Sequence, residues 1–172
     1  MHLAGVGFLE VVLMSDVAVK LAERLSTLNW LMATAESCTG GLIAAHCTDL
    51  PGSSAWFDRG FVTYSNDAKT QMLGVPAELI AAQGAVSESV AHAMAMGTLY
   101  RSKAQVSVAV TGVAGPSGGT PEKPVGTVWF GWCINGAVST EMKHFEGSRD
   151  KVRQATVTHA LDGLLTRLSL SS

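Results

Sequence analysis

The feature that most constrains the fold of this sequence is an alternation between helix-period segments and short apolar runs. Between residues 16 and 28, apolar side chains recur every three or four positions, which is the period of a helix with one buried face. These positions are Val17, Leu21, Leu25 and Leu28. Residues 30–35 then form an apolar run that stops at polar Glu36 and Ser37, which is typical of a buried strand ending in a loop. The alternation favours an α/β domain.

The remaining segments continue this alternation. We expect further helices over residues 40–47, 65–72, 76–82, 87–103 and 148–168. We expect further strands over residues 61–64, 105–111, 125–134 and 137–145. Asn135-Gly136, between the last two strands, is the strongest short signal for an antiparallel hairpin. The sequence therefore predicts a single three-layer α/β/α sandwich with a mixed, mostly parallel sheet and a crevice at the carboxyl ends of its strands.

Length and charge exclude several classes of protein. The chain has 172 residues, of which 47% are hydrophobic and 15% charged, and a chain of this size buries enough surface to fold without disulfides or a structural metal. Twelve Lys and Arg against fourteen Asp and Glu give a formal net charge of −2. Since no basic field results, we expect binding to neither nucleic acid nor a membrane surface.

The three cysteines, Cys38, Cys47 and Cys133, contain no C-x-x-C pair and no cluster at zinc-ligand spacing. A reducing cytoplasm is therefore the expected location, and no metal site is predicted.

The first 14 residues are apolar but lack a basic segment, and Glu10 interrupts the apolar run. This pattern predicts neither a signal peptide nor a membrane span. Ser15-Asp16 directly follows Met14 and has the composition of a helix N-cap. We therefore expect residues 15–170 to form the domain and residues 1–14 to be an N-terminal extension, either flexible or read from an upstream start.

The first candidate for chemistry is AESCTGG, residues 35–41, at the exit of a buried strand and the entrance of a helix. A serine at this place, Ser37, faces the crevice, and the amides of Cys38, Thr39 and Gly40 would supply donors for an oxyanion or a phosphate. The alternative is that Ser37 or Thr39 only caps the helix. The G-x-S-x-G motif of common hydrolases is absent.

The second candidate is YSNDAK, residues 64–69. A lysine such as Lys69 acts as a general base toward a serine when burial and the positive end of a helix keep it neutral. Tyr64, at the end of a strand, could share or relay the proton. The alternatives are a solvated surface lysine and a strand aromatic half inside the core.

The third candidate is the glycine-rich loop TGVAGPSGG, residues 111–119. Repeated glycines after a strand let backbone amides approach an anion closely, although the loop matches neither the Walker A nor the G-x-G-x-x-G pattern. The alternative is an ordered turn that shields a sheet edge. Arg149, which opens the last helix after a Ser148 cap, could also reach a phosphate from there.

Five segments carry a family resemblance: AESCTGG (35–41), GSSAWFDRGFVTYSNDAK (52–69), GAVSE (84–88), TGVAGPSGG (111–119) and KPVGTVWF (123–130). In this order they closely resemble the CinA C-terminal domain family, and the likeness covers nearly everything from Asp16 to Leu168. It implies a single-domain amidohydrolase that hydrolyses the carboxamide of nicotinamide mononucleotide to nicotinate mononucleotide and ammonia, in pyridine-nucleotide salvage.

The resemblance also implies roles for individual residues. The family's serine nucleophile falls on Ser37, its lysine on Lys69 and its tyrosine on Tyr64. The nucleotide's phosphate or ribose is expected at Thr111, Gly112, Gly115, Gly118 and Gly119, with Thr39, Gly40, Gly41 and Arg149 as secondary candidates. No metal or cofactor is expected, and the resemblance favours a homo-oligomer, a dimer.

Two alternatives to this function stay open at the level of sequence. One is a non-catalytic nucleotide-binding module linked to a competence or DNA-damage response. In this module Ser37 and Lys69 would have only helix-capping and ion-pairing roles. The other is an amidase for a different small amide, which would share the machinery and differ in the lining of the pocket.

Overall fold

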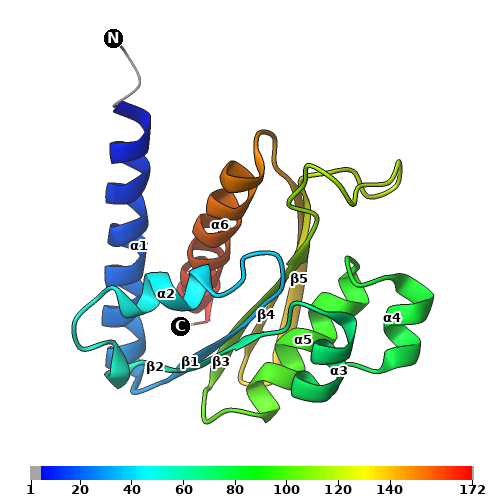
Figure 1. The fold of residues 1–172 in the computed structure, drawn as a ribbon. Coiled ribbons are helices and arrows are strands. Elements are labelled where there is room, and N and C mark those ends of the chain that lie inside the picture. Colours follow the sequence, from blue (N-terminus) through cyan, green and yellow to red (C-terminus); the bar gives the residue numbers. More distant parts are fainter. Residues whose placement is uncertain (1–4, 172) are drawn as a thin grey trace.

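A computed structural model describes residues 5–171 of the chain, with side chains from residue 16 onward. A five-stranded sheet lies between two layers of helices (Figure 1). The helices α1, α2 and α6 cover one face, and α3, α4 and α5 cover the other. Their bounds are α1 Gly5–Leu28, α2 Leu42–Thr48, α3 Asn66–Leu73, α4 Ala77–Gln83, α5 Glu88–Tyr100 and α6 Arg149–Leu170. The predicted single three-layer α/β/α domain is confirmed.

The sheet has the strand order β2-β1-β3-β4-β5. Its strands are β1 Met32–Glu36, β2 Phe57–Val62, β3 Val106–Gly112, β4 Thr127–Ile134 and β5 Ala137–His144. Strand β1 pairs in parallel with both β2 and β3, whereas β4 runs antiparallel to β3 and β5. Four strands therefore point the same way and only β4 opposes them, so the sheet is mixed and mostly parallel, as predicted.

Several predicted helix boundaries are confirmed by their caps. The Ser65 hydroxyl accepts a hydrogen bond from the Ala68 amide at 3.0 Å, and α3 closes at Gly74, whose φ is 71°. Ser87 and Ser148 cap α5 and α6 in the same way, through the amides of Val90 and Lys151. These caps satisfy free amides in the first turns of the helices and set the residue at which each helix begins.

Two predicted boundaries are wrong. Helix α1 begins at Gly5 and passes through Ser15, which is therefore not its cap; no proline interrupts the helix before this residue. Strand β2 begins at Phe57 rather than at residue 61, because its backbone pairs with β1 along its whole length. A Cβ at Gly60 in this strand would lie 2.8 Å from Thr34 Oγ1, so glycine is required for the close packing there.

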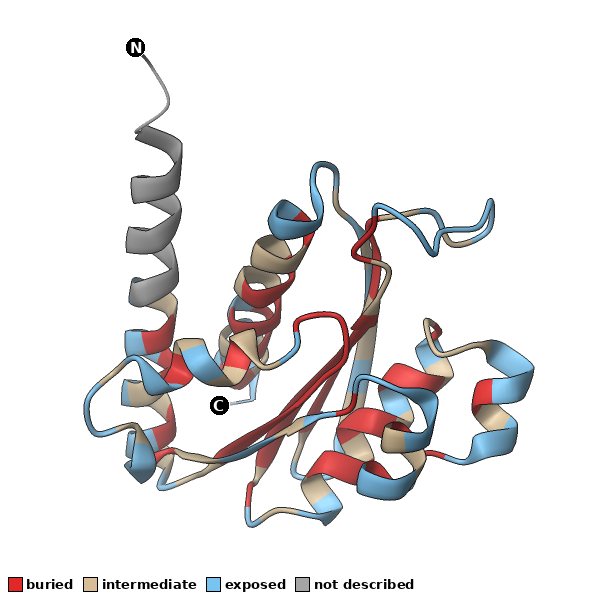
Figure 2. Cartoon of the chain, in the orientation of Figure 1, coloured by how far each residue is buried: buried red, intermediate tan, exposed pale blue. Residues whose placement is uncertain are grey.

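The hydrophobic core lies on both faces of the sheet, and Figure 2 shows the central strands as its most buried part. On the α1/α2/α6 face, Trp132 is fully buried and its indole N–H donates to the Ala160 carbonyl at 2.9 Å. A Cβ at Gly163 would lie 2.4 Å from the Trp132 ring, which brings α6 close to the sheet. The opposite face buries Met94 of α5 and Leu73 of α3.

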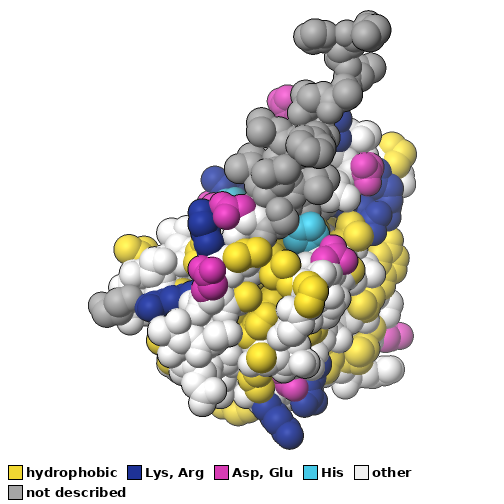
Figure 3. Space-filling model, turned by 90° about the vertical axis from the view of Figure 1, so that its left-hand side faces the viewer, with side chains coloured by type: hydrophobic (Ala, Val, Ile, Leu, Met, Phe, Trp, Pro, Cys, Tyr) yellow, Lys and Arg dark blue, Asp and Glu magenta, His cyan; other side chains and the backbone are white. Residues whose placement is uncertain are grey.

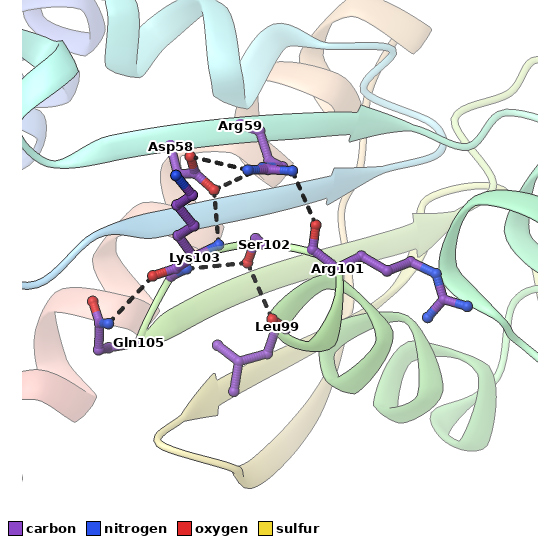
Figure 4. A network of polar contacts seen from close by, with 8 residues as sticks. Asp58, Arg59, Leu99, Arg101, Ser102, Lys103 and Gln105 are labelled. Carbon is purple, nitrogen blue, oxygen red and sulfur yellow. Dashed lines mark hydrogen bonds and ion pairs between the residues drawn. The ribbon is translucent and has the colours of Figure 1, made fainter.

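A polar network closes the end of the sheet at which the parallel strands begin (Figure 4). The Asp58 carboxylate accepts hydrogen bonds from Arg59 Nε at 2.7 Å and from the Lys103 amide at 3.0 Å. Arg59 in turn donates to the Arg101 carbonyl at 3.2 Å. These charged groups are thus engaged in joining β2 to the connection between α5 and β3. The cavity with the serine and the lysine lies at the opposite end of the strands.

Candidate active site

Ser37 is the first residue after β1, at the carboxyl edge of the sheet. Its amide donates to the Val110 carbonyl of the neighbouring strand at 3.2 Å, which ties the start of the turn to β3. The turn is buried (Figure 2), and Ser37 itself is only 9% exposed. Ser37 lines a cavity of about 330 Å³. The predicted crevice at the carboxyl ends of the strands is therefore present, with Ser37 in its wall.

Lys69 reaches Ser37 from the other side of the crevice. Its Nζ lies 3.0 Å from Ser37 Oγ and donates to the Thr63 carbonyl at 2.9 Å. The side chain is 1% exposed, and no carboxylate pairs with it among residues 16–171. Burial lowers the pKa of Lys69. The alternative of a solvated surface lysine is wrong.

The local sequence explains why Lys69 points inward. The Ser65 cap starts α3, so Lys69 follows in the first turn and a half of the helix, facing the sheet. The partial positive charge at the start of a helix adds to burial in disfavouring an ammonium ion there. In its neutral form, the amine donates one N–H to Thr63 and presents its lone pair to the Ser37 hydroxyl. In such an arrangement a neutral lysine can act as a base toward a serine.

Glu36 is a buried carboxylate whose role the sequence analysis did not anticipate. It is 1% exposed, and its oxygens accept hydrogen bonds from Thr39 Oγ1 at 2.7 Å and from the amides of Ile43 at 2.8 Å and Ala44 at 3.0 Å. The amino-terminal amides of α2 are therefore occupied by a carboxylate of the chain itself. The signal in the sequence was an acidic residue just before a helix start, where the helix dipole favours negative charge.

The three amides expected to face a ligand, those of Cys38, Thr39 and Gly40, are not all free to do so. The Gly40 amide, one of the three expected donors, is used within the turn, where it donates to the Ser37 carbonyl at 3.1 Å. The Cys38 amide donates to no backbone carbonyl among the described residues, and Cys38 lines the cavity. Cys38 directly follows Ser37, and the amide after a nucleophile is a common oxyanion donor.

The thiol of Cys38 is not a competing nucleophile. Cys38 is 6% exposed, and burial raises the pKa of its thiol to about 11. Because the reactive form of cysteine is the thiolate, Cys38 is essentially unreactive at neutral pH.

Tyr64 and Arg149 meet at the rim of the same cavity. Arg149 Nη2 donates to the Tyr64 hydroxyl at 3.1 Å, and Arg149 Nη1 donates to the Gly115 carbonyl at 2.8 Å. Tyr64 is 62% exposed, so it is not half inside the core. Its hydroxyl bonds to Arg149 rather than to Lys69. Arg149 thereby joins the start of α6, the glycine-rich loop and the segment between β2 and α3.

The cavity gathers most, but not all, of the residues predicted to bind substrate. Those in its lining are Thr111, Gly112, Gly115, Gly118 and Arg149. Thr111 and Gly112 end β3, and Gly115 and Gly118 belong to the loop that follows it, at the same end of the sheet as the start of α6 (Figure 1). The Thr111 hydroxyl donates to the Ala85 carbonyl at 2.9 Å, which connects the loop to the segment before α5.

Four predicted binding residues lie outside the cavity lining: Thr39, Gly40, Gly41 and Gly119. Thr39 is fully buried and gives its hydroxyl to Glu36. Gly41 precedes α2 with a φ of 106°, a conformation that favours glycine. A Cβ at Gly119 would lie 2.7 Å from the Val125 amide, so this glycine serves loop packing.

The lining also includes residues that the sequence analysis did not select: Cys38, Asn66, Ala85, Val86, Val113, Ala114 and Ser117. Asn66, Val113, Ala114 and Ser117 lie inside motifs already singled out. Ala85 and Val86 belong to GAVSE, which was quoted without a role. Apolar lining residues have no local signal, because only the fold shows which loop packs against which.

Two further properties concern the described part of the chain alone. Between residues 5 and 171, no group of three or more His, Cys, Asp or Glu side chains could hold a metal ion. No helix in that range combines the length and the apolarity that crossing a membrane requires.

Fold and site together define an α/β domain with a buried serine–lysine pair at the carboxyl edge of its sheet. The chain belongs to the CinA C-terminal domain family, whose sequence model matches residues 14–168. It is 53% identical over 151 residues to the nicotinamide-nucleotide amidohydrolase PncC of Pseudomonas putida, covering 88% of this chain and 94% of that protein.

Two other similarities agree with this assignment. The PncC protein of Escherichia coli K12 is 48% identical over 150 residues, covering 87% of this chain and 91% of its own. The crystal structure of the competence/damage inducible protein CihA from Agrobacterium tumefaciens superposes with a TM-score of 0.87 at 48% identity, covering 91% of this chain and 96% of that one. The resemblance read from the five motifs is confirmed.

Proposed function

We propose that this protein is an amidohydrolase that converts nicotinamide mononucleotide to nicotinate mononucleotide and ammonia. The single observation that carries the proposal is the 3.0 Å contact between the buried Lys69 Nζ and Ser37 Oγ, in the wall of a cavity. The relatives named nicotinamide-nucleotide amidohydrolase, at 48% and 53% identity, support the choice of substrate.

The proposed reaction has two steps. Neutral Lys69 takes the proton of Ser37 as Oγ forms a bond to the carboxamide carbon, and the proton passes to the amide nitrogen, which leaves as ammonia. Water then attacks the resulting ester, gives a proton to Lys69, and releases the carboxylic acid and the Ser37 hydroxyl. The Cys38 amide donates to the oxyanion in both steps.

Arg149 and the glycine-rich loop supply the proposed nucleotide contacts. A cavity of about 330 Å³ is at the lower end of the range for small-ligand sites. Arg149 lies at its rim with a guanidinium suited to bidentate binding of a phosphate. When Arg149 turns to a phosphate, its bond to Tyr64 is released, and the Tyr64 hydroxyl can then assist proton transfer at Lys69.

The direct test measures products. Purified protein is incubated with nicotinamide mononucleotide without added metal, beside Ser37→Ala, and ammonia and nicotinate mononucleotide are quantified. We expect equal amounts of both products from the wild type and neither from the variant. Binding without turnover would instead support the nucleotide-binding module. Neither binding nor turnover would point to a different amide.

The cellular setting is also a proposal. Three buried cysteines without a disulfide, and relatives that act on nicotinamide nucleotides by name, support a cytoplasmic enzyme of pyridine-nucleotide salvage. We take residues 15–170 as its domain, which the family match over residues 14–168 supports.

We further propose a homodimer. Hydrophobic side chains reach the surface on the side of the molecule where α1 lies (Figure 3), and Val19 of this helix is 39% exposed. Light scattering coupled to gel filtration tests the proposal: a mass of two chains supports it and a mass of one chain contradicts it.

A further inference from the structure

We propose that Arg153, on α6, is a positioning residue of the reaction: it fixes the peptide units behind Ser37, so that Ser37 Oγ and the Cys38 amide keep their places in the cavity wall. This inference rests on the proposed amidohydrolase function. Arg153 does not line the cavity, so it acts through the turn rather than on the substrate.

The contacts of Arg153 join two distant parts of the chain. Its Nε donates to the Cys38 carbonyl at 3.1 Å and its Nη2 donates to the Thr39 carbonyl, also at 3.1 Å. One rigid, planar guanidinium thus holds two successive carbonyls. Gly40 beside these carbonyls has a φ of 60°, a left-handed conformation that favours glycine, and a Cβ there would make an ordinary contact with Arg153 Nη2 at 3.7 Å.

Peptide geometry shows what these contacts control. In a trans peptide unit the N–H and the C=O point in opposite directions. The Ser37 carbonyl accepts from the Gly40 amide inside the turn, so the Cys38 N–H points away from the interior of the turn. Arg153 holds the next two carbonyls. Rotation of the Cys38–Thr39 or the Thr39–Gly40 peptide unit would therefore break a hydrogen bond to a charged donor. The second of these units carries the Gly40 amide that holds the Ser37 carbonyl, and with it the direction of the Cys38 N–H.

Glu36 holds the same turn from the other side, through Thr39 Oγ1 and the amides of Ile43 and Ala44. The two side chains are complementary, because Glu36 accepts from N–H and O–H groups of the turn and of α2, whereas Arg153 donates to carbonyls of the turn. Loss of Glu36 would leave the buried Ile43 amide and the part-buried Ala44 amide unpaired and threaten the fold. Arg153 is half-buried, so its replacement is the cleaner test of positioning.

Arg167 offers a matched control on the same helix. Its Nη1 donates to the Gly163 carbonyl at 3.0 Å, its Nε donates to Ser139 Oγ at 2.7 Å, and its guanidinium lies 3.6 Å from the centre of the Trp132 ring. It is absent from the cavity lining. It also pairs with the Glu141 carboxylate at 3.6 Å. Arg167→Met therefore removes at least as many contacts of an α6 arginine without touching the turn at Ser37.

The experiment compares Arg153→Met, Arg153→Lys and Arg167→Met in the full chain with nicotinamide mononucleotide. Because small misplacements of reacting groups cost up to about a hundredfold in rate, we expect Arg153→Met to lower kcat by about tenfold or more, with KM changed by less than about threefold. The pH profile should keep its midpoint, since Lys69 is intact. Arg153→Lys should recover part of the rate, and Arg167→Met should keep the wild-type kcat.

A second readout does not depend on this substrate. The rate at which phenylmethylsulfonyl fluoride modifies Ser37 is followed by intact mass, and it should fall in Arg153→Met but not in Arg167→Met. If the wild type releases no ammonia and this difference still appears, the proposed function fails and the positioning role stands. The positioning role is refuted if the reagent modifies Ser37 in Arg153→Met at the wild-type rate. It is also refuted if the modification of Ser37 slows equally in Arg167→Met.

Discussion

Lys69 Nζ lies 3.0 Å from Ser37 Oγ, although 32 positions of sequence separate the two residues. Strand β1 places the serine at its carboxyl end, and the capped start of α3 directs the lysine to the same point. The other contact of Lys69 Nζ is the neutral Thr63 carbonyl, so this amine is buried without a counter-charge from any side chain of residues 16–171. Both the activity and the pH dependence of stability should therefore depend on the buried amine of Lys69.

Replacement of Lys69 by Met should remove activity. Because the variant lacks the base, turnover of nicotinamide mononucleotide should fall by about a thousandfold or more. Far-UV circular dichroism checks that the fold remains. Turnover within tenfold of the wild type, with an unchanged spectrum, would exclude Lys69 as the base.

The same variant should alter the pH dependence of stability. Burial lowers the folded pKa of Lys69 below its ordinary value of 10.5, so the unfolded chain binds more protons. The cost of burying Lys69 is complete below the folded pKa, shrinks as the pH rises, and is gone above 10.5. The stability of Lys69→Met relative to the wild type should thus decrease from pH 7 to pH 10.5 in urea unfolding. An increase would contradict the lowered pKa.

Activity should rise with pH. Only neutral Lys69 can accept the Ser37 proton, so kcat/KM should increase about tenfold per pH unit below the folded pKa of Lys69 and level off above it. The midpoint should lie below 10.5, the ordinary value for lysine. A profile that falls with rising pH across this range would require the ammonium form and a different mechanism.

Arg149 should determine affinity for the phosphate. Arg149→Met removes hydrogen bonds to a charged group, so KM for nicotinamide mononucleotide should rise about tenfold to a hundredfold. Nicotinamide riboside, which lacks the phosphate, serves as the matched substrate, and its KM should change little. An equal rise in KM for both substrates would show that Arg149 does not bind the phosphate.

Tyr64 should affect rate rather than affinity. Tyr64→Phe removes only the hydroxyl that we propose to assist proton transfer, so kcat should fall by about tenfold or more while KM holds. Tyr100→Phe is the control, because Tyr100 is 82% exposed at the end of α5. A wild-type kcat in Tyr64→Phe would contradict the role of the Tyr64 hydroxyl and show that Lys69 needs no such assistance.

The fold was predictable where local signals agree. Ser65 and Gly74 marked both ends of α3, and Asn135-Gly136 marked the hairpin between β4 and β5. Strand β2 was placed too late because it lies at the sheet edge, where Asp58 and Arg59 break the apolar pattern while their backbone still pairs with β1. Edge strands keep their ladder without an alternating sequence, so the pattern is a weak guide there.

The site was predictable for the same kind of reason, and only in part. Ser37 and Lys69 each stood beside an element boundary, which gave their places in the crevice. Glu36 and Arg153 were missed because their roles depend on backbone groups of the turn. Arg153 contacts a carbonyl 115 positions away, and no local pattern encodes such a contact.

The most direct measurement of the central claim is ammonia release from nicotinamide mononucleotide by the wild type, Ser37→Ala and Lys69→Met, assayed side by side without added metal. A serine nucleophile activated by a lysine base predicts steady release by the wild type and none above background by either variant, with all three proteins folded. Release by Ser37→Ala at a rate near that of the wild type would contradict it.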